Sequence, residues 1–350
     1  EQTAFVKGRS IGEGIHLLQL LPHLLASEGR WALVVFCDFC KAYDTVDRGF
    51  LLSVLEQLGA GPGWCSWVRL LLTNTRAAAL VNGSLSGQRQ LLAGVRQGCP
   101  LAPLLYLFVA LALLRFLQHK GVGVTVAGQQ HTATQYADDC DPFLEGGSAQ
   151  QVTGRVAAFM AAMGTFAAAS GQRLNASKTK LLPIGRLPSV LPASIGGLQV
   201  ALSATTLGIT FNSGISPASV DWGPRHAEVK RCYSKLASLE PSLSALGRGL
   251  NSTSYGTSKL LFAAEYAGLP DPQTLVELRR WTTGLVDAGV GPDHDHRGSP
   301  VFHGVRGELL PGPPSQGGFG VLAWEQHIKA RHAVWAVRLV TEGRANRQQA

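Results

Sequence analysis

Cysteine is scarce and scattered in this sequence, which argues against a fold held together by disulfides. Six cysteines are spread over 350 residues, whereas disulfide-dependent domains are short and crowd their cysteines together. Cys37 and Cys40 form a CxxC pair, but a structural zinc site needs a second ligand pair at matching spacing, and the sequence has none. We interpret both as small apolar residues packed near a strand end, in a protein of a reducing compartment.

A hydrophobic run long enough to span a membrane is also missing. The most apolar stretch, Leu101–Leu114, has 14 residues, with prolines at positions 100 and 103 and Arg115 directly after it. A transmembrane helix needs about 20 apolar residues. The run is therefore predicted to be a buried helix, and no membrane partner is expected.

Acidic residues are outnumbered, with 23 Asp and Glu against 31 Lys and Arg, for a formal net charge of +8. This balance suits a polyanionic partner such as nucleic acid, although an ordinary basic protein can share it. A length of 350 residues and 45% hydrophobic content predict a sizeable core and two or three modules. The chain begins at Glu1 with residues typical of a domain interior, so we expect a fragment of a longer protein.

Strand-like and helical patterns alternate through the first two thirds of the chain. The β-branched and aromatic run Trp31–Cys37 predicts a buried strand with Asp38 at its tip. Asp47 is expected to cap an amphipathic helix, and Asn82-Gly83 to form a hairpin turn. The other predicted elements are a helix at 101–118, strands at 122–127 and 131–136 around a Gly128 turn, a helix from Ser148 to Gly171, and a Pro/Gly-rich connector at 183–197.

This alternation favours an α+β architecture in which helices cover one face of a sheet. Beyond about residue 220 the pattern becomes helical, with amphipathic segments near 224–240, 253–268, 272–288 and 323–341.

Three acidic residues are the strongest candidates for chemistry. Asp38 ends one apolar strand, and Asp138 and Asp139 stand together at the tip of a predicted hairpin. A single strand-end aspartate is usually a turn former, but adjacent carboxylates repel each other unless a cation neutralises them. Carboxylates that hold two Mg²⁺ or Mn²⁺ ions are a known solution for phosphoryl transfer. From the residues alone, metal-dependent phosphoryl chemistry and structural turns both stay open.

Seven sequence blocks resemble the reverse transcriptase domain of non-LTR, LINE-type retrotransposons in order and spacing. They are FVKGRSI (5–11), DFCKAYDTVDR (38–48), VNGSLSG (81–87), GVRQGCPLAP (94–103), YADD (136–139), SGQRLNASKTK (170–180) and TTLGI (205–209). The later segments ALGRGLN (245–251) and GGFGVLAWEQH (317–327) resemble the helical region that follows this domain. The resemblance covers nearly the whole chain.

The resemblance implies a role for each matching residue. Asp38, the Phe39 carbonyl, Asp138 and Asp139 match the ligands of two Mg²⁺ or Mn²⁺ ions, and Lys178 matches a proton donor to the leaving pyrophosphate. The nucleotide site is matched by Tyr43, which would lie under the sugar, and by Arg96, Gln97 and Gly98. Template and primer contacts are matched by Lys7, Arg9, Leu207 and Gly208.

Simpler interpretations accompany several of these residues. Lys178 can be a solvated loop lysine, Tyr43 core filler, and Arg96 a surface charge. Two departures from the family pattern are visible as well. Thr206 stands where the primer-contacting block usually has an aromatic residue, and Pro142 would remove a backbone donor from a central strand or displace that strand by one residue.

The resemblance implies a right-hand polymerase with a ferredoxin-like palm sheet. Its parts are partial fingers at 1–30 and 62–95, a palm at 31–61 and 96–217, and a helical, thumb-like region at 218–350. The implied reaction extends a DNA primer with deoxynucleoside triphosphates on an RNA template, and a nuclear location is expected. A catalytically impaired nucleic-acid-binding relic, an intron maturase and a domesticated polymerase remain alternatives.

Overall fold

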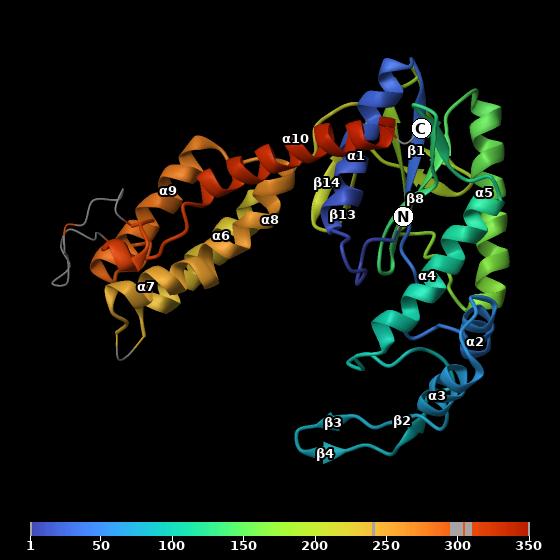
Figure 1. Cartoon of the computed structure of the whole chain (residues 1–350), viewed down its shortest axis with the longest axis horizontal. Helices are drawn as coiled ribbons and strands as arrows, with labels where there is room; N and C mark the ends of the chain where they lie inside the picture. The colour runs from blue at the N-terminus through green and yellow to red at the C-terminus, as the bar shows by residue number, and fades with distance from the viewer. Residues whose placement is uncertain (1, 240–241, 295–303, 305–309, 349–350) are drawn as a thin grey trace. The chain divides into compact units, whose positions relative to one another are not determined.

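The computed structural model describes residues 2–239, 242–294, 304 and 310–348. The chain divides into two compact units, residues 1–218 and 219–350. Each unit is described by itself below, with the labels of Figure 1.

The first unit is built on a six-stranded sheet in the order β11-β12-β10-β1-β9-β8. Its strands are β1 (Trp31–Phe36), β8 (Ala133–Tyr136), β9 (Asp139–Glu145), β10 (Lys180–Gly185), β11 (Ser194–Ile195) and β12 (Leu198–Val200). Four of them are antiparallel neighbours in the order β10-β1-β9-β8, with β8 at the edge. Numbered along the chain this order is 4-1-3-2, the ferredoxin-like arrangement.

Helices cover both faces of this sheet, so the expectation of one covered face is wrong. The helices are α1 (Ile11–Ser27), α2 (Arg48–Gln57), α3 (Pro62–Leu72), α4 (Ala102–His119) and α5 (Ala149–Ser170). Leu33 and Val35 of β1 join the core formed with α2 to α5. Side chains alternate along a strand, and the intervening Ala32 and Val34 are also buried, because α1 packs against β1, β8 and β10.

The helix boundaries follow the capping signals in the sequence. Asp47 accepts a hydrogen bond from the Phe50 N–H at the start of α2, and Ser148 forms a capping box with Gln151 at the start of α5. Gly171 ends α5 in the left-handed conformation, as predicted. The apolar helix α4 is long and apolar enough to cross a membrane by length and composition, but Leu105, Val109 and other residues place it in the core.

Four short hairpin pairings complete the first unit. They are β2 (Arg76–Ala77) with β5 (Arg89–Gln90), β3 (Leu80–Val81) with β4 (Ser84–Leu85), β6 (Val124–Val126) with β7 (Gln129–His131), and β13 (Ser203–Thr206) with β14 (Ile209–Asn212). Asn82 and Gly83 form the predicted turn, both with positive φ as in a type I′ turn. The Gly128 turn instead joins β6 to β7, and β8 is a separate strand that pairs with β9.

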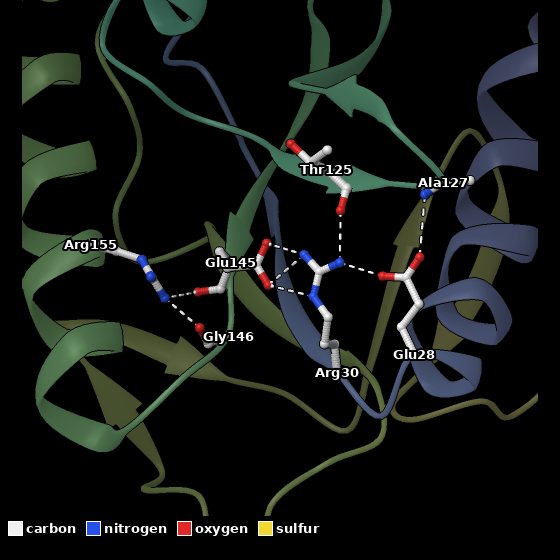
Figure 2. A network of polar contacts seen from close by, with 7 residues as sticks. All are labelled: Glu28, Arg30, Thr125, Ala127, Glu145, Gly146 and Arg155. Carbon is white, nitrogen blue, oxygen red and sulfur yellow. Dashed lines mark hydrogen bonds and ion pairs between the residues drawn. The ribbon is translucent and has the colours of Figure 1, made fainter.

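A polar network fixes the end of the sheet where β1 begins and β9 ends (Figure 2). The Arg30 guanidinium donates to both oxygens of Glu145, at 2.9 and 2.8 Å from Nη2. The same guanidinium contacts Glu28 and donates to the Thr125 carbonyl at 2.8 Å. Such a bidentate arginine–carboxylate pair fixes geometry as well as charge. It therefore joins α1, β9 and the β6–β7 hairpin at one point.

The second unit is helical, and the four predicted amphipathic segments are confirmed. Its described elements are α6 (Trp222–Ala237), α7 (Ala245–Asn251), η1 (Ser252–Thr257), α8 (Ser258–Ala267), α9 (Pro272–Thr283), η2 (Gly284–Ala288), η5 (Pro314–Gln316) and α10 (Trp324–Gln348). Tyr233, Leu260 and Trp281 belong to its core. The buried Glu265 of α8 pairs with Arg331 at 2.7 Å and accepts from Trp335 Nε1 at 3.0 Å, so α10 is tied to α8.

Candidate active site

The YADD block forms the turn between β8 and β9. Tyr136 pairs with Asp139, which leaves Ala137 and Asp138 as a two-residue loop. Ala137 has a φ of 56°, which two-residue hairpins need at their first position but which alanine adopts with difficulty. Ala137 is buried, and Asp138 is exposed at the tip. The turn therefore presents the Asp138 carboxylate to solvent from a constrained backbone.

The register of the sheet brings the third acidic residue to the same place. Cys37, the residue after β1, forms an antiparallel bridge with Cys140, and its N–H donates to the Cys140 carbonyl at 3.3 Å. The next residues along the two strands are Asp38 and Asp139, which therefore face each other across the strand pair. Two segments about a hundred residues apart in the sequence thus place three carboxylates together at the ends of neighbouring strands.

Pro142 interrupts the ladder between β1 and β9 without shifting it. The pairing Val34–Phe143 lies on one side and the bridge Cys37–Cys140 on the other, and both fit a single register. The opposite pairing, Ala133 with Pro142, keeps the register of β8 and β9. Pro142 thus removes a ladder donor, as predicted, but the strand remains central and undisplaced.

The electrostatics of the three acidic residues suit a bound cation. Partial burial, and then the charges of Asp138 and Asp38, raise the pKa of Asp139 to about 6. Like charges held this close disfavour ionisation, and a divalent cation reverses the effect. Carboxylate oxygens are the ligands that Mg²⁺ and Mn²⁺ prefer.

Within the described residues, no three His, Cys, Asp or Glu side chains form a ready-made metal cluster. Mg²⁺ sites commonly take one or two carboxylates from the protein and complete their shell with water and substrate phosphates. The donor chemistry of Asp38, Asp138 and Asp139 fits hard divalent ions such as Mg²⁺.

The loop that carries Lys178 is attached to the backbone of Asp38. The Asn175 N–H donates to the Asp38 carbonyl at 2.7 Å, and the Asp38 N–H donates to Thr179 Oγ1 at 3.3 Å. The side chain of Lys178, between these two anchors, is exposed. Phe39 pairs with Leu174 of this loop as an antiparallel β-bridge. The two flanking hydrogen bonds use the carbonyls of Asp38 and Arg173, and not that of Phe39.

Tyr43 lies against a second aromatic ring beside the acidic residues. Its ring stacks on Tyr106 of α4, with centroids 4.4 Å apart and an interplanar angle of 19°. The Tyr106 hydroxyl donates to Gln172 Oε1 at 3.1 Å, and Gln172 Nε2 donates to the Ala42 carbonyl at 2.8 Å. Burial, and then the charge of Asp138, raise the pKa of Tyr43. The ring is thus half-buried, fixed from behind and close to Asp138.

The GVRQG loop runs along the segment that contains Tyr43. The Val95 N–H donates to the Tyr43 carbonyl at 2.8 Å, and Gln97 Nε2 donates to Asp44 Oδ1 at 3.2 Å. Gly94 has a φ of 84°, and a Cβ there would meet the Asp44 carbonyl oxygen at 2.6 Å. Only glycine allows this close approach. Arg96, Gln97 and Gly98 are exposed beside it.

Comparison with known proteins now decides the family. The family model described as reverse transcriptase (RNA-dependent DNA polymerase) matches residues 1–211, more than half of the 350 residues. The chain belongs to this family. Its fold is that of an α+β polymerase, and its relatives are proteins of non-LTR retrotransposons.

Two relatives indicate the kind of element. An uncharacterised 149 kDa protein of transposon TX1 from Xenopus laevis is 28% identical over 193 residues, which are 53% of this chain and 14% of that protein. A Pol polyprotein of the type-1 retrotransposable element R2 from Popillia japonica is 32% identical over 108 residues, 30% of this chain and 15% of that protein. The chain thus spans about a seventh of the length of these relatives.

Telomerases are similar among solved structures. The structure from Candida albicans, with a fragment of telomeric RNA, has a TM-score of 0.44 and 12% identity, and the match covers 82% of this chain and 49% of that one. Apo telomerase from Candida tropicalis also has a TM-score of 0.44, with 10% identity over 77% of this chain and 50% of that one.

Thr206, one departure of this reverse transcriptase chain from its family pattern, contacts a buried acidic residue in the structure. Thr206 and Thr134 form side-chain hydrogen bonds with the buried Asp141, the latter at 3.2 Å. Burial, and then the charge of Asp139, raise the pKa of Asp141 to about 8. Asp141 therefore keeps its proton at neutral pH. The threonine in place of an aromatic residue supplies the polar partner that a buried acid requires.

Thr206 also leads into the turn predicted to contact the primer. Leu207 and Gly208 join β13 to β14, with φ values of 51° and 75° as in a type I′ turn. Leu207 is a branched, non-glycine residue in a conformation that such residues rarely adopt. The predicted pair is therefore confirmed as a tight turn, and its contact with a primer stays a prediction.

The remaining predicted contacts lie on the segment before and at the start of α1. Lys7 and Arg9 are both exposed. Arg9 pairs with Glu13 one helical turn later, at 2.9 Å. An exposed pair of this kind contributes little to stability, and the contact of Arg9 with template phosphate stays a prediction.

Sequence reasoning missed the role of Arg48, although this residue lies in a quoted block. Its guanidinium donates to the carbonyls of Leu72, Leu91, Ala93 and Gly94 and to Thr75 Oγ1, at 2.7 to 3.1 Å. Arg48 thereby fixes both ends of the segment that leads into the GVRQG loop. The position of Arg48 at the start of a predicted helix gives no hint of this role, because its partners are backbone atoms or residues distant in the sequence.

Cys37 and Cys40 behave differently from each other. Cys37 packs against the core, as predicted for a small residue near a strand end. Cys40 is exposed, so its predicted burial is wrong. Both thiols are free.

Proposed function

We propose that this chain is the polymerase core of a LINE-type retroelement and extends a DNA primer on an RNA template. The observation that carries the proposal is the register Cys37–Cys140, which sets Asp38 opposite Asp139 and beside the Asp138 turn. The family match over residues 1–211 supports it. The activity remains a proposal because the chain spans only a small part of its relatives.

The proposed reaction is in-line attack of the primer 3′-hydroxyl on the α-phosphate of a deoxynucleoside triphosphate. Asp38, Asp138 and the Phe39 carbonyl would hold two Mg²⁺ or Mn²⁺ ions, with Asp139 as the second carboxylate of the pair. When bound, such ions neutralise charge on the attacking and leaving oxygens. The protein contributes positioning and electrostatics, and no covalent intermediate is required.

Other residues are assigned to substrate positions. Tyr43 would pack against the sugar, where its ring fills the volume of a 2′-hydroxyl, and Gln97, with Arg96 and Gly98, would contact the nucleotide. Lys178 would donate a proton to the leaving pyrophosphate, because its loop is tied to Asp38. Lys7 and Arg9 would contact template phosphates, and the Leu207–Gly208 turn the primer.

We also propose the division into polymerase subdomains. Residues 1–30 and 62–95 are assigned to partial fingers, 31–61 and 96–217 to the palm, and 218–350 to a helical, thumb-like region. Nuclear location is proposed from the family, since retroelements insert their copies into chromosomal DNA.

Primer extension tests the proposal directly. Purified chain, a poly-rA template, an oligo-dT primer and dTTP are combined with Mg²⁺ or Mn²⁺, and product length is followed. Asp138→Asn should reduce extension by several orders of magnitude, because a lost metal ligand removes several kcal/mol of transition-state stabilisation. The matched control is Glu56→Gln, which removes an exposed acid from α2 and should leave the rate unchanged.

The outcomes separate the alternatives. If the wild type extends the primer and Asp138→Asn extends it at a similar rate, the assignment of Asp138 as a metal ligand is refuted. Template binding without any extension in either metal would favour a nucleic-acid-binding relic over an enzyme.

A further inference from the structure

The turn that presents Asp138 is held by a side chain from the start of the chain. Gln2 Nε2 donates to the Ala137 carbonyl at 3.2 Å, and the Ala137 N–H donates to Gln2 Oε1 at 3.0 Å. One primary amide thus satisfies both backbone groups of the residue with positive φ. A carboxylate can accept but cannot donate, so only an amide completes both bonds.

The backbone around Gln2 is anchored by neighbouring residues as well as by its own side chain, since Gln2 Oε1 also accepts from the Ala4 N–H at 2.9 Å. Gln2 bridges Gln135 in parallel fashion beside β8, and Figure 1 shows the start of the chain next to this strand. The Thr3 N–H and hydroxyl both donate to the Gln135 carbonyl at 3.0 Å. Thr3 and Ala4 are buried. The segment therefore caps the edge of the sheet, and the two Thr3 contacts should hold it there when the Gln2 side chain is shortened, although the Ala4 N–H then loses its acceptor.

The positive φ of Ala137 means that the turn depends on the two hydrogen bonds from the Gln2 side chain. A non-glycine residue at positive φ is uncommon and persists where the surroundings fix it. Ala137 lies directly between Tyr136 and Asp138, so a relaxed φ at this position would rotate the Asp138 carboxylate away from Asp38. Neither the family match nor the sequence blocks assign any role to Gln2.

We propose that Gln2 is a positioning residue that holds the Ala137–Asp138 turn in the conformation required to bind a divalent cation. The proposal rests on the proposed function only in taking Asp138 as a metal ligand. Gln2 acts through the backbone of Ala137 and touches neither substrate nor cation.

Three variants of the full chain test this proposal: Gln2→Ala, Ala137→Gly and the double variant. Glycine adopts positive φ readily, so Ala137→Gly should make the turn less dependent on Gln2. The first readout is hydrogen exchange of the peptide over residues 133–141, which requires neither metal nor activity. The second is Mn²⁺ affinity, measured by electron paramagnetic resonance without RNA or nucleotide.

Gln2→Ala should raise hydrogen exchange in the turn and weaken Mn²⁺ binding by about tenfold, because two hydrogen bonds to the turn are lost. The double variant should recover most of that affinity, while Ala137→Gly alone should bind Mn²⁺ nearly as the wild type does. The control Gln129→Ala removes an exposed glutamine from β7 and should change neither readout.

Several outcomes would overturn the proposal. Unchanged exchange and Mn²⁺ affinity in Gln2→Ala, a loss that Ala137→Gly does not rescue, or no Mn²⁺ binding by the wild type would each do so. A chain whose Mn²⁺ affinity depends on Gln2 and Asp138 but which never extends a primer would refute the proposed function and leave the role of Gln2 standing.

Discussion

Replacing Tyr43 with alanine should make the enzyme accept ribonucleotides more readily. The Tyr43 ring is stacked on Tyr106 at 4.4 Å, so its plane cannot rotate freely away from a bound sugar. Rejection of a single small group by shape is worth about 1–3 kcal/mol, or about 10–200-fold in selectivity. Tyr43→Ala should relax the preference for deoxynucleotides by that factor.

The support behind the ring gives this prediction an internal control. Tyr43→Phe keeps the ring and should keep the selectivity. Tyr106→Ala removes the stacking partner, which is itself worth about 0.5–1.5 kcal/mol, and should produce a smaller loss of selectivity than Tyr43→Ala. Tyr106→Phe retains the stack but leaves the buried Gln172 oxygen without its donor, so it should lower stability and spare selectivity.

The assay is the ratio of kcat/KM for rGTP and dGTP on one poly-rC template, in the wild type and each variant. Overall rates should fall in Tyr43→Ala, because the ring also positions the correct substrate. An unchanged ratio in a Tyr43→Ala enzyme that still extends DNA would identify the ring as core filler. The alignment of the DFCKAYDTVDR block with the polymerase motif would then be wrong.

Three further predictions follow from charges and hydrogen bonds. Because Asp139 must ionise to bind a cation and its pKa is about 6, Mn²⁺ affinity should rise as pH increases through 6, and a flat profile between pH 5 and 7 would contradict this. The raised pKa of Asp141, about 8, means that the native state holds a proton the unfolded chain has lost, so stability should fall as pH rises from about 4 to 8; in denaturant titrations, Asp141→Asn should lose less stability than the wild type between pH 6 and 8. Arg48→Lys should lower the free energy of unfolding by about 2 kcal/mol, since an ammonium has three donors for five acceptors. The same variant should raise KM for the nucleotide, and an unchanged KM would mean that the GVRQG loop takes no part in nucleotide binding.

Local signals predicted most of the first unit. Asp47, Ser148 and Gly171 set helix ends through their own side chains or backbone preferences, so each could be identified within a few residues of sequence. The Asn82-Gly83 turn is of the same kind. Such features depend on residues nearby in the sequence and can therefore be predicted without knowledge of the fold.

Strand β10 was missed because tertiary pairing overrides its local signals. Pro183 and Gly185 indicated a connector, yet both lie in β10, opposite Leu33 and Trp31 of β1. The covering of the second sheet face by α1 was missed for a similar reason. The continuous apolar run of β1 is typical of a strand buried on both faces, but the run does not indicate which helix covers the second face.

The acidic residues of the candidate site could be identified, but their supports could not. Asp38, Asp138 and Asp139 stand at strand ends that the hydrophobic pattern reveals. Gln2 and Arg48 act through backbone atoms of distant segments, and no residue type or spacing marks that action. Sequence reasoning thus found the groups that do chemistry more readily than those that hold them in place.

The interruption at Pro142 gives the two ends of the central strand pair different mechanical properties. At one end, Arg30 clamps Glu145 with a bidentate contact. At the other, beyond the proline, a single bridge between Cys37 and Cys140 joins the strands. Few backbone hydrogen bonds must yield for the acidic residues to move apart. The end of the strand pair that carries the acidic residues should therefore deform more easily than the end that Arg30 fixes.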